Sequence, residues 1–312
     1  MSEDLPGRRR IAVVTDDAAA LPPEWVRPPG GGDAAAPRDG AALGAVEAAI
    51  RPGLAVVTMP VTVDGQSLVG DARQWPSAVA RALAEDRTVS TSRPSPGQLL
   101  RVYRRLESEG FEGIVSIHCS RELSGTLGSA QIAAATTTVP VRIVDTRTIA
   151  MGEGFGVIAA WEAAGSGGDL EAVAEAAQEA SAANPLLLWV PGLETLRRGG
   201  RIGPSVAALG GVLQVKPLLR VSHGQLAVVE LPRTEARARQ RFQRRAGRAL
   251  AHTAAAEPEL VIHYLDDAAT AREIGAEIVA THRPEARLRC LRLPAVLAAH
   301  AGLGAVAAVV RG

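Results

Sequence analysis

The feature that most constrains the fold is a regular alternation of apolar runs and amphipathic segments between residues 96 and 164. Two of these runs have the composition of buried strands, and three segments have the apolar spacing of helices. The predicted strands are residues 113–118 and 141–144, and the predicted helices are residues 96–109, 125–137 and 154–164. Strands that alternate with helices of this length predict βαβ units and a parallel sheet.

The pattern changes after the glycine-rich stretch 165–168. Residues 216–221 and 225–231 flank Ser222-His223-Gly224, which is typical of a β-hairpin turn. Further predicted strands are 11–15, 54–63, 186–190, 260–265 and 287–293, and further predicted helices are 77–85, 169–183, 193–198, 206–213, 234–251 and 268–280. We expect the apolar tail 295–310 to form strand and turn. A hairpin among helices predicts a mixed α+β arrangement for this half.

These patterns predict an α/β protein with two lobes. The N-terminal lobe is expected to span residues 1–166 and to contain the parallel sheet, and the C-terminal α+β lobe is expected to span residues 167–312. Residues 27–42 are rich in proline, glycine and alanine, so we expect a flexible surface insertion there.

Composition excludes several classes of protein. Hydrophobic residues make up 47% of the 312 residues, which is enough for a large core and excludes a disordered chain. The net charge of +1 argues against attachment to nucleic acid by bulk positive charge. Cys119 and Cys290 are too few for a disulfide scaffold, and neither has an assigned role. The chain lacks a signal-peptide core and a long apolar run, so we expect a cytoplasmic protein without stable membrane insertion.

Motifs for cofactors are weak. The glycine-rich segments 152–156 and 199–203 match neither GxxxxGK[ST] nor GxGxxG, so we expect no nucleotide on this chain. Its six histidines and two cysteines form no HExxH or CxxC motif, and we expect no metal site. Ser124 follows a predicted strand, where a nucleophile would stand, but its surroundings are not GxSxG. A helix N-cap is the alternative role of this serine.

Hydroxyl side chains precede two predicted helices. Ser95 and Pro96 suit a helix cap and first turn, which leaves Thr91 and Ser92 without a structural role. Thr91 and Ser124 each follow a predicted strand, and open α/β sheets bind ligands at the carboxyl ends of their strands. Helix starts also offer free N–H groups to anions. The sequence therefore predicts an oxyanion site that includes Thr91 and Ser124.

Taken together, the motifs resemble the DegV family of bacterial fatty-acid-binding proteins, over nearly the full length and in the same order. The matching segments are 14–16, 59–61, 91–97, 117–120, 123–130, 144–146, 151–154, 193–203, 215–219 and 300–304. The hydroxyl loop 91–97, the serine–glycine turn at 124–125 and the glycine–arginine turn 199–203 are specific as a set.

The resemblance implies that a single long-chain fatty acid lies in a tunnel between the lobes. It implies that a separate fatty acid kinase subunit, similar to dihydroxyacetone kinases, phosphorylates the carboxylate. This protein would present the acid and then carry the acyl phosphate, as a binding subunit rather than an enzyme, with ATP and magnesium on the partner. The residues that the resemblance places at the carboxylate are Thr91, Ser92, Ser124, Gly125, Arg201 and His300.

A docking surface for the kinase is expected at Arg197, Arg198 and Arg201; a solvated helix end is the alternative for the first two. The chain departs from the family pattern at Arg93, which replaces the usual glutamine, and at Leu127, which replaces the usual tyrosine. Two further functions stay open. One is a stand-alone lipid carrier or sensor without a kinase, and the other is an esterase or acyl transferase that uses Ser124 and His300.

Overall fold

The first half of the chain forms a five-stranded sheet. The structure is a computed structural model that describes residues 10–26, 47–202 and 215–312. The strands lie in the order β2-β3-β1-β7-β8, and all pairs are parallel except β2 with β3. Their bounds are β1 Ile11–Asp16, β2 Glu47–Arg51, β3 Leu54–Val57, β7 Gly113–His118 and β8 Val141–Asp145. The predicted parallel sheet is confirmed, whereas the expected insertion at 27–42 and helix at 206–213 lie outside the described residues.

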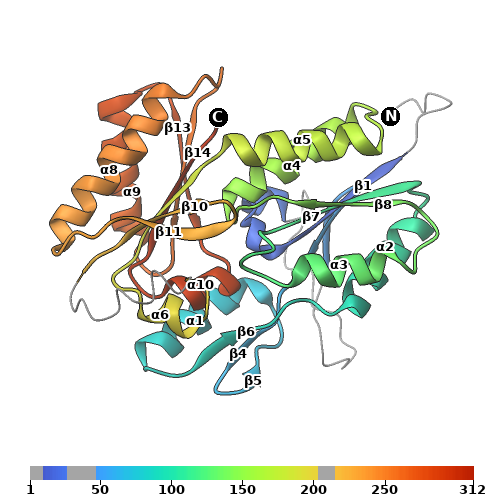
Figure 1. The fold of residues 1–312 in the computed structure, drawn as a ribbon, viewed down its shortest axis with the longest axis horizontal. Coiled ribbons are helices and arrows are strands. Elements are labelled where there is room, and N and C mark those ends of the chain that lie inside the picture. The colour runs from blue at the N-terminus through green and yellow to red at the C-terminus, as the bar shows by residue number, and fades with distance from the viewer. Residues whose placement is uncertain (1–9, 27–46, 203–214) are drawn as a thin grey trace.

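Helices cover both faces of this sheet (Figure 1). One face packs against α2 (Pro96–Ser108) and α3 (Thr126–Ala134), and the other packs against α4 (Met151–Gly165) and α5 (Leu170–Ala183). Strands buried on both faces read as the continuous apolar runs found in the sequence. Helix α5 follows the boundary expected at residue 166, yet it packs on β7 and β8 of the N-terminal sheet.

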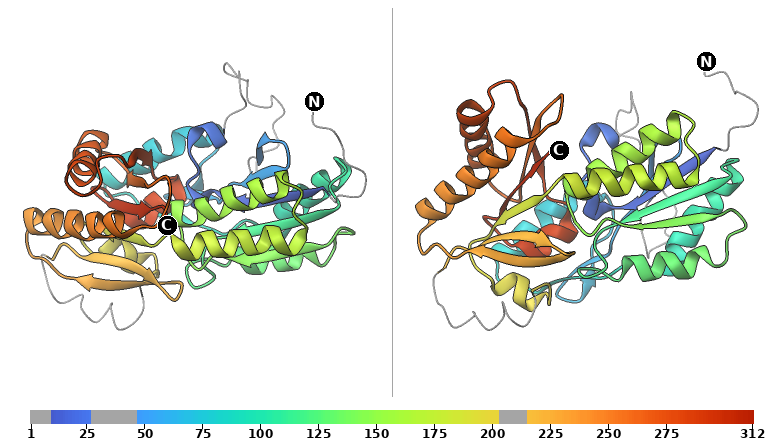
Figure 2. Two further views of the ribbon diagram at one scale, coloured as in Figure 1. Left: turned by 90° about the horizontal axis from the view of Figure 1, so that it is seen from above. Right: turned by 45° about the horizontal axis from the view of Figure 1, so that its top comes forward.

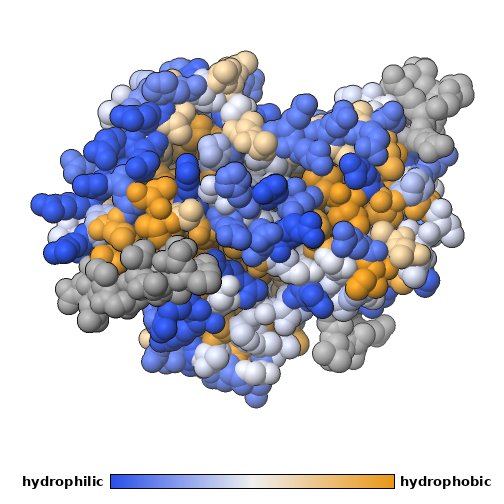
Figure 3. All heavy atoms as spheres, viewed as in Figure 1, coloured by the Kyte–Doolittle hydropathy of each residue, from blue (hydrophilic) through white to orange (hydrophobic). Residues whose placement is uncertain are grey.

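The second half forms a mixed six-stranded sheet in the order β11-β10-β9-β14-β12-β13. Its strands are β9 Leu186–Trp189, β10 Leu218–Ser222, β11 Gln225–Glu230, β12 Glu259–Tyr264, β13 Arg287–Arg292 and β14 Val306–Val310. The outer face packs against α8 (Glu235–His252) and α9 (Ala268–His282), and the arginine-rich outer surface of α8 is hydrophilic (Figure 3). The predicted hairpin is confirmed: β10 and β11 pair antiparallel across a turn in which His223 and Gly224 both have positive φ.

The prediction of strand and turn for residues 295–310 is wrong in its first half. Residues Ala295–Ala301 form helix α10, and only the second half forms strand β14. Alanine has the highest helix propensity, Pro294 occupies the N-cap, and Gly302 ends the helix at φ 81°. Five residues of α10 are buried, because it packs against α1 (Trp75–Ala84) and α6 (Glu194–Arg198). A helix buried on most sides has few polar residues, so its sequence lacks the alternation of apolar and polar positions that indicates a helix.

A small antiparallel sheet, β5-β4-β6, lies beside α10 at the edge of the molecule (Figure 1). The two halves of the chain lie side by side in the two further views (Figure 2). Its strands are β4 Val61–Val63, β5 Gln66–Ser67 and β6 Val89–Thr91. The largest apolar cluster of the described residues joins the inner face of the six-stranded sheet to α10, α1 and the start of α4. No helix in the described parts of the chain combines the length and the apolar character needed to span a bilayer. The two main sheets therefore meet across an apolar seam.

Candidate ligand site

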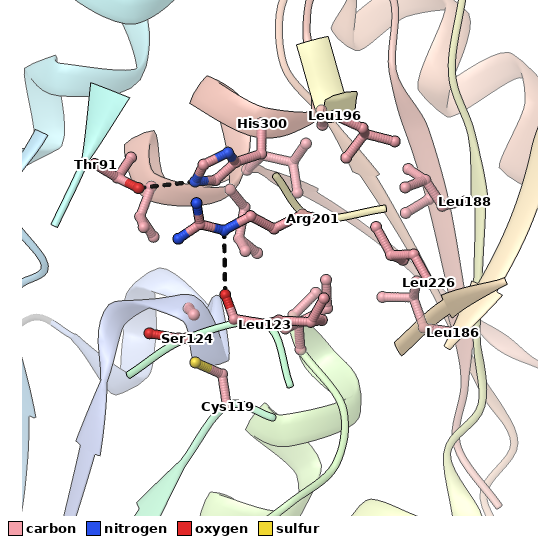
Figure 4. Close-up of a pocket in the computed structure, with 18 of the residues that line it drawn as sticks. Thr91, Cys119, Leu123, Ser124, Leu186, Leu188, Leu196, Arg201, Leu226 and His300 are labelled. Atoms are coloured by element: carbon pink, nitrogen blue, oxygen red, sulfur yellow. Dashed lines mark hydrogen bonds between the residues drawn. The ribbon is translucent and has the colours of Figure 1, made fainter. Parts of the chain in front are cut away.

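A cavity lies in this seam and has walls from both halves of the chain. Its empty volume, including space open to solvent, is about 720 Å³. Four polar side chains, Thr91, Ser124, Arg201 and His300, lie toward one end, and Cys119 lies beside Ser124 (Figure 4). The other lining residues are all Leu, Ile, Val, Met or Ala. The cavity is thus amphipathic, with a polar end and an aliphatic end.

His300 lies in the last turn of α10 and bonds across the seam to Thr91 at the end of β6. Their Nε2 and Oγ1 atoms are 2.8 Å apart. The other side of the ring packs against Gly199, where an added Cβ would lie 2.4 Å from Nδ1 of His300. Glycine at 199 is therefore required for the imidazole to reach Thr91.

Arg201 and Ser124 complete the polar end of the cavity. The guanidinium of Arg201 donates to the carbonyl oxygen of Leu123 at 3.2 Å and also to that of Gly199. Ser124 Oγ is 2.8 Å from Thr126 Oγ1 and accepts from the Thr126 backbone N–H. The N-cap of α3 is Gly125, so the alternative interpretation of Ser124 as the N-cap is wrong.

Burial controls the protonation of this end of the cavity. Burial first, and then the positive charge of Arg201, lower the pKa of His300 to about 4. The imidazole is therefore neutral at pH 7. Burial also raises the pKa of the Cys119 thiol, and the negative charge of Asp16 is the next largest cause. Cys119 is thus a neutral thiol and a poor nucleophile.

The structure brings together four of the six residues predicted at the carboxylate. Thr91, Ser124, Arg201 and His300 line one cavity, although they are separated by up to 209 residues. Ser92 and Gly125 are exposed and do not line it. Each directly follows a lining residue, and its role at the carboxylate stays a prediction.

The other sequence predictions concern the arginine patch and the hydrolase alternative. Arg197 and Arg198 are exposed at the end of α6, and both pair with Glu194. This ion pairing partly neutralises the predicted docking patch. Ser124 bonds to Thr126, whereas His300 bonds to Thr91, so the nucleophile–base hydrogen bond of a Ser124–His300 hydrolase is not formed.

Sequence reasoning missed a buried polar chain beneath the cavity. Tyr103 bonds to Ser116 at 2.7 Å, Ser116 to His118 at 2.8 Å, and His118 Nδ1 to Asp16 Oδ2 at 2.9 Å. Asp16 also accepts from the backbone N–H of Ala18, which lines the cavity. The signal was present in the sequence, because Ser116 and His118 are two residues apart on one strand and so share a face. This chain fixes the cavity floor.

A buried carboxyl cluster adjoins that chain. One ligand atom each of Asp16, Cys119 and Glu153 lies within 4.8 Å of the others, and Thr15 Oγ1 donates to Glu153 Oε1 at 3.1 Å. Burial raises the pKa of Glu153 well above its usual value, and the charge of Asp16 raises it further. Both oxygens of Asp16 already accept protein hydrogen bonds. A raised pKa favours the protonated, neutral form of Glu153, which reduces the negative charge of the cluster.

A mostly parallel sheet joined to a mixed sheet, with an amphipathic cavity at the seam, defines an α/β protein of two halves. Comparisons with known proteins agree on one family. The family model described as an uncharacterised protein of the DegV family matches residues 40–311. A DegV domain-containing protein of Streptomyces coelicolor is 34% identical over 303 residues, which cover 97% of this chain and 98% of that protein. The chain belongs to the DegV family.

Solved structures show the same fold. A DegV family protein from Thermus thermophilus, described as fatty-acid binding, superposes with a TM-score of 0.78 at 29% identity, covering 97% of this chain and 99% of that one. DegV from Bacillus subtilis, described as a fatty acid binding protein, superposes with a TM-score of 0.76 at 23% identity, with coverages of 97% and 99%. The predicted fold class and family are confirmed.

Proposed function

We propose that this protein binds a long-chain fatty acid, with the alkyl chain in the cavity and the carboxylate at its polar end. The observation that carries the proposal is the segregation of the lining, in which Thr91, Arg201 and His300 face an aliphatic wall (Figure 4). Leu186, Leu188 and other aliphatic side chains form that wall and suit an alkyl chain. Fatty-acid binding by the relative from Thermus thermophilus supports the same reading.

The energetics support an aliphatic ligand. Complete burial of about 14 methylene groups of a C16 acid contributes roughly 11 kcal/mol, at ~0.8 kcal/mol each. This is comparable with the ~4–15 kcal/mol that association costs in lost freedom. The alkyl chain of the ligand therefore supplies most of the binding free energy. The polar end of the cavity has to accept the carboxylate without a large desolvation penalty.

The polar end has the donors for this task. The Thr91 hydroxyl and the neutral His300 imidazole can each donate a hydrogen bond to a carboxylate oxygen once they release one another. Ser124 offers a third hydroxyl. Arg201 supplies a fixed positive charge that no described carboxylate neutralises, because both its partners are backbone carbonyls. Hydrogen bonds to an ionised group contribute about 1.5–3 kcal/mol each.

The finer part of the proposal is that the protein presents the acid to a separate ATP-dependent kinase and then carries the acyl phosphate. A carboxylate oxygen would bond to the γ-phosphorus of ATP while the bond from that phosphorus to the leaving oxygen of ADP breaks. This step needs the carboxylate within reach of a partner that holds ATP and magnesium. Thr91, Ser124, Arg201 and His300 are only half-buried, which supports such access. A carrier or sensor without a kinase is the alternative.

Delipidated protein tests the binding proposal directly. We expect one palmitate or oleate per chain by native mass spectrometry and calorimetry. Thr91→Ala and His300→Ala should each weaken binding about 10-fold or more. Thr62→Ala is the matched control, because Thr62 on β4 loses a similar bond, to Ser90 at 2.6 Å, away from the cavity lining. Absence of lipid binding by the wild type would overturn the proposal.

A further inference from the structure

The guanidinium of Arg93 lies near the polar end of the cavity, and within the described residues it forms no ion pair with an acidic side chain. Arg93 lies on the loop between β6 and α2, two residues after Thr91. Its guanidinium packs over Gly125, where an added Cβ would lie 2.7 Å from Nη1 and 2.9 Å from Cδ. Gly125 directly follows Ser124, which lines the cavity. Arg93 is therefore close to both hydroxyl-bearing segments of the headgroup end, although it is exposed and outside the lining.

The loop that carries Arg93 is held at both ends. The backbone N–H of Ser92 donates to the Pro60 carbonyl at 2.9 Å. On the other side, Ser95 and Gln98 form a reciprocal capping box at the start of α2. Pro94 and Pro96 further restrict this backbone. The backbone that carries Arg93 is thus held on both sides.

The charges at this end exceed what a carboxylate requires. Within the described residues, neither Arg93 nor Arg201 forms an ion pair with an acidic side chain. His300 is neutral because burial lowers its pKa to about 4. Two positive charges therefore lie near the headgroup end, Arg201 in the lining and Arg93 just outside it, whereas a fatty acid carries one negative charge. A phosphate monoester carries about −1.5 to −2 at pH 7, so an acyl phosphate matches the pair of arginines more closely.

We propose that Arg93 forms a phosphoryl subsite at the mouth of the cavity, which binds the phosphoryl group of an acyl phosphate while Arg201 stays with the acyl end. The inference rests on the proposed function and names the residue of this chain that would hold the phosphoryl group of the acyl phosphate. An arginine suits this role because its planar guanidinium offers two parallel donors to phosphate oxygens. The exposed position of Arg93 lets it contact a group that extends beyond the carboxylate.

The test compares two ligands of equal chain length. Palmitate carries a carboxylate, and hexadecylphosphonate, assayed at about pH 8.5 where it is mainly a dianion, is a stable mimic of the phosphorylated headgroup. For Arg93→Gln we expect about 5- to 10-fold weaker binding of hexadecylphosphonate and palmitate affinity within twofold of the wild type. Gly125→Ala should reproduce this split, because its Cβ displaces the guanidinium of Arg93. Arg101→Gln, an exposed arginine on α2, is the matched control and should leave both affinities unchanged.

The outcomes separate the two proposals. If the wild type binds palmitate but Arg93→Gln binds both ligands as tightly as the wild type, the phosphoryl subsite is overturned and the fatty-acid site stands. If Arg93→Gln weakens both ligands equally, Arg93 is a general headgroup residue and the subsite is again overturned. If the wild type binds neither ligand, the proposed function itself fails. Raising the salt concentration should weaken phosphonate binding more than palmitate binding, and Arg93→Gln should remove that difference.

Discussion

Gly199 offers the sharpest test of how the headgroup end is built. Its backbone has φ −72° and ψ −11°, so alanine fits the backbone and should stabilise it by about 0.4–1 kcal/mol through the unfolded chain. The added Cβ, however, would lie 2.4 Å from Nδ1 and 3.1 Å from Cε1 of His300. Ordinary contacts between such atoms are ~3.5 Å, so the imidazole has to withdraw by about 1 Å.

That displacement removes a specific interaction. The bond between His300 Nε2 and Thr91 Oγ1 is 2.8 Å long, and about 1 Å of movement takes the pair beyond hydrogen-bonding distance. The imidazole is then also misplaced for a carboxylate. A lost hydrogen bond to an ionised group corresponds to about 1.5–3 kcal/mol, so Gly199→Ala should weaken palmitate binding roughly 10- to 100-fold. Its thermal stability should stay close to that of the wild type, because the lost hydrogen bond, about 0.5–1.5 kcal/mol, offsets the gain from alanine.

Calorimetry on delipidated protein gives the affinity, and thermal unfolding gives the stability. Gly192→Ala is the matched control, because no other heavy atom lies within 4 Å of the Cβ added there. That variant should bind palmitate like the wild type. Palmitate affinity within twofold of the wild type in Gly199→Ala would refute the argument that this glycine positions His300.

Three further changes test the cavity, the buried cluster and the loop. Leu226→Trp fills the aliphatic end, so native mass spectrometry should show loss of C16 acids with C8 acids retained; equal retention would contradict the assigned direction of the chain. The pKa of Glu153 is higher in the folded protein than in the unfolded chain, so the proton on Glu153 stabilises the fold. This stabilisation is complete below the unfolded-state pKa near 4.5, and it is lost as the pH rises through the folded-state pKa. Denaturation from pH 5 to 8 should therefore show Glu153→Gln gaining on the wild type by up to about 1.4 kcal/mol per pH unit, and parallel profiles would show that Glu153 is ionised. Ser95→Ala breaks the capping box and should lower unfolding free energy by about 1 kcal/mol; an unchanged denaturation midpoint would contradict this.

Periodicity predicted most elements because they follow local rules. The Ser222-His223-Gly224 turn, the Asp169 cap of α5 and the capping serine at 95 all act through neighbours in the sequence. Helix α10 was missed because its surroundings are apolar on most sides, which removes the periodic signal. The packing of α5 on the N-terminal sheet depends on contacts across the glycine-rich turn that the sequence marks only as a linker.

The headgroup end could be predicted from residue types but not from spacing. Ser124 follows β7 of the parallel sheet, whereas Thr91 ends β6 of the small antiparallel sheet, so the topology of one sheet does not by itself bring them together. His300 comes from the opposite half, and only the packing of α10 against β6 and α6 delivers its ring to Thr91. The residue that makes this approach feasible is Gly199, whose missing side chain has no signature in a single sequence. Convergence across the seam is thus a property of packing, and the resemblance to a family was needed to place His300 in the site before the structure did.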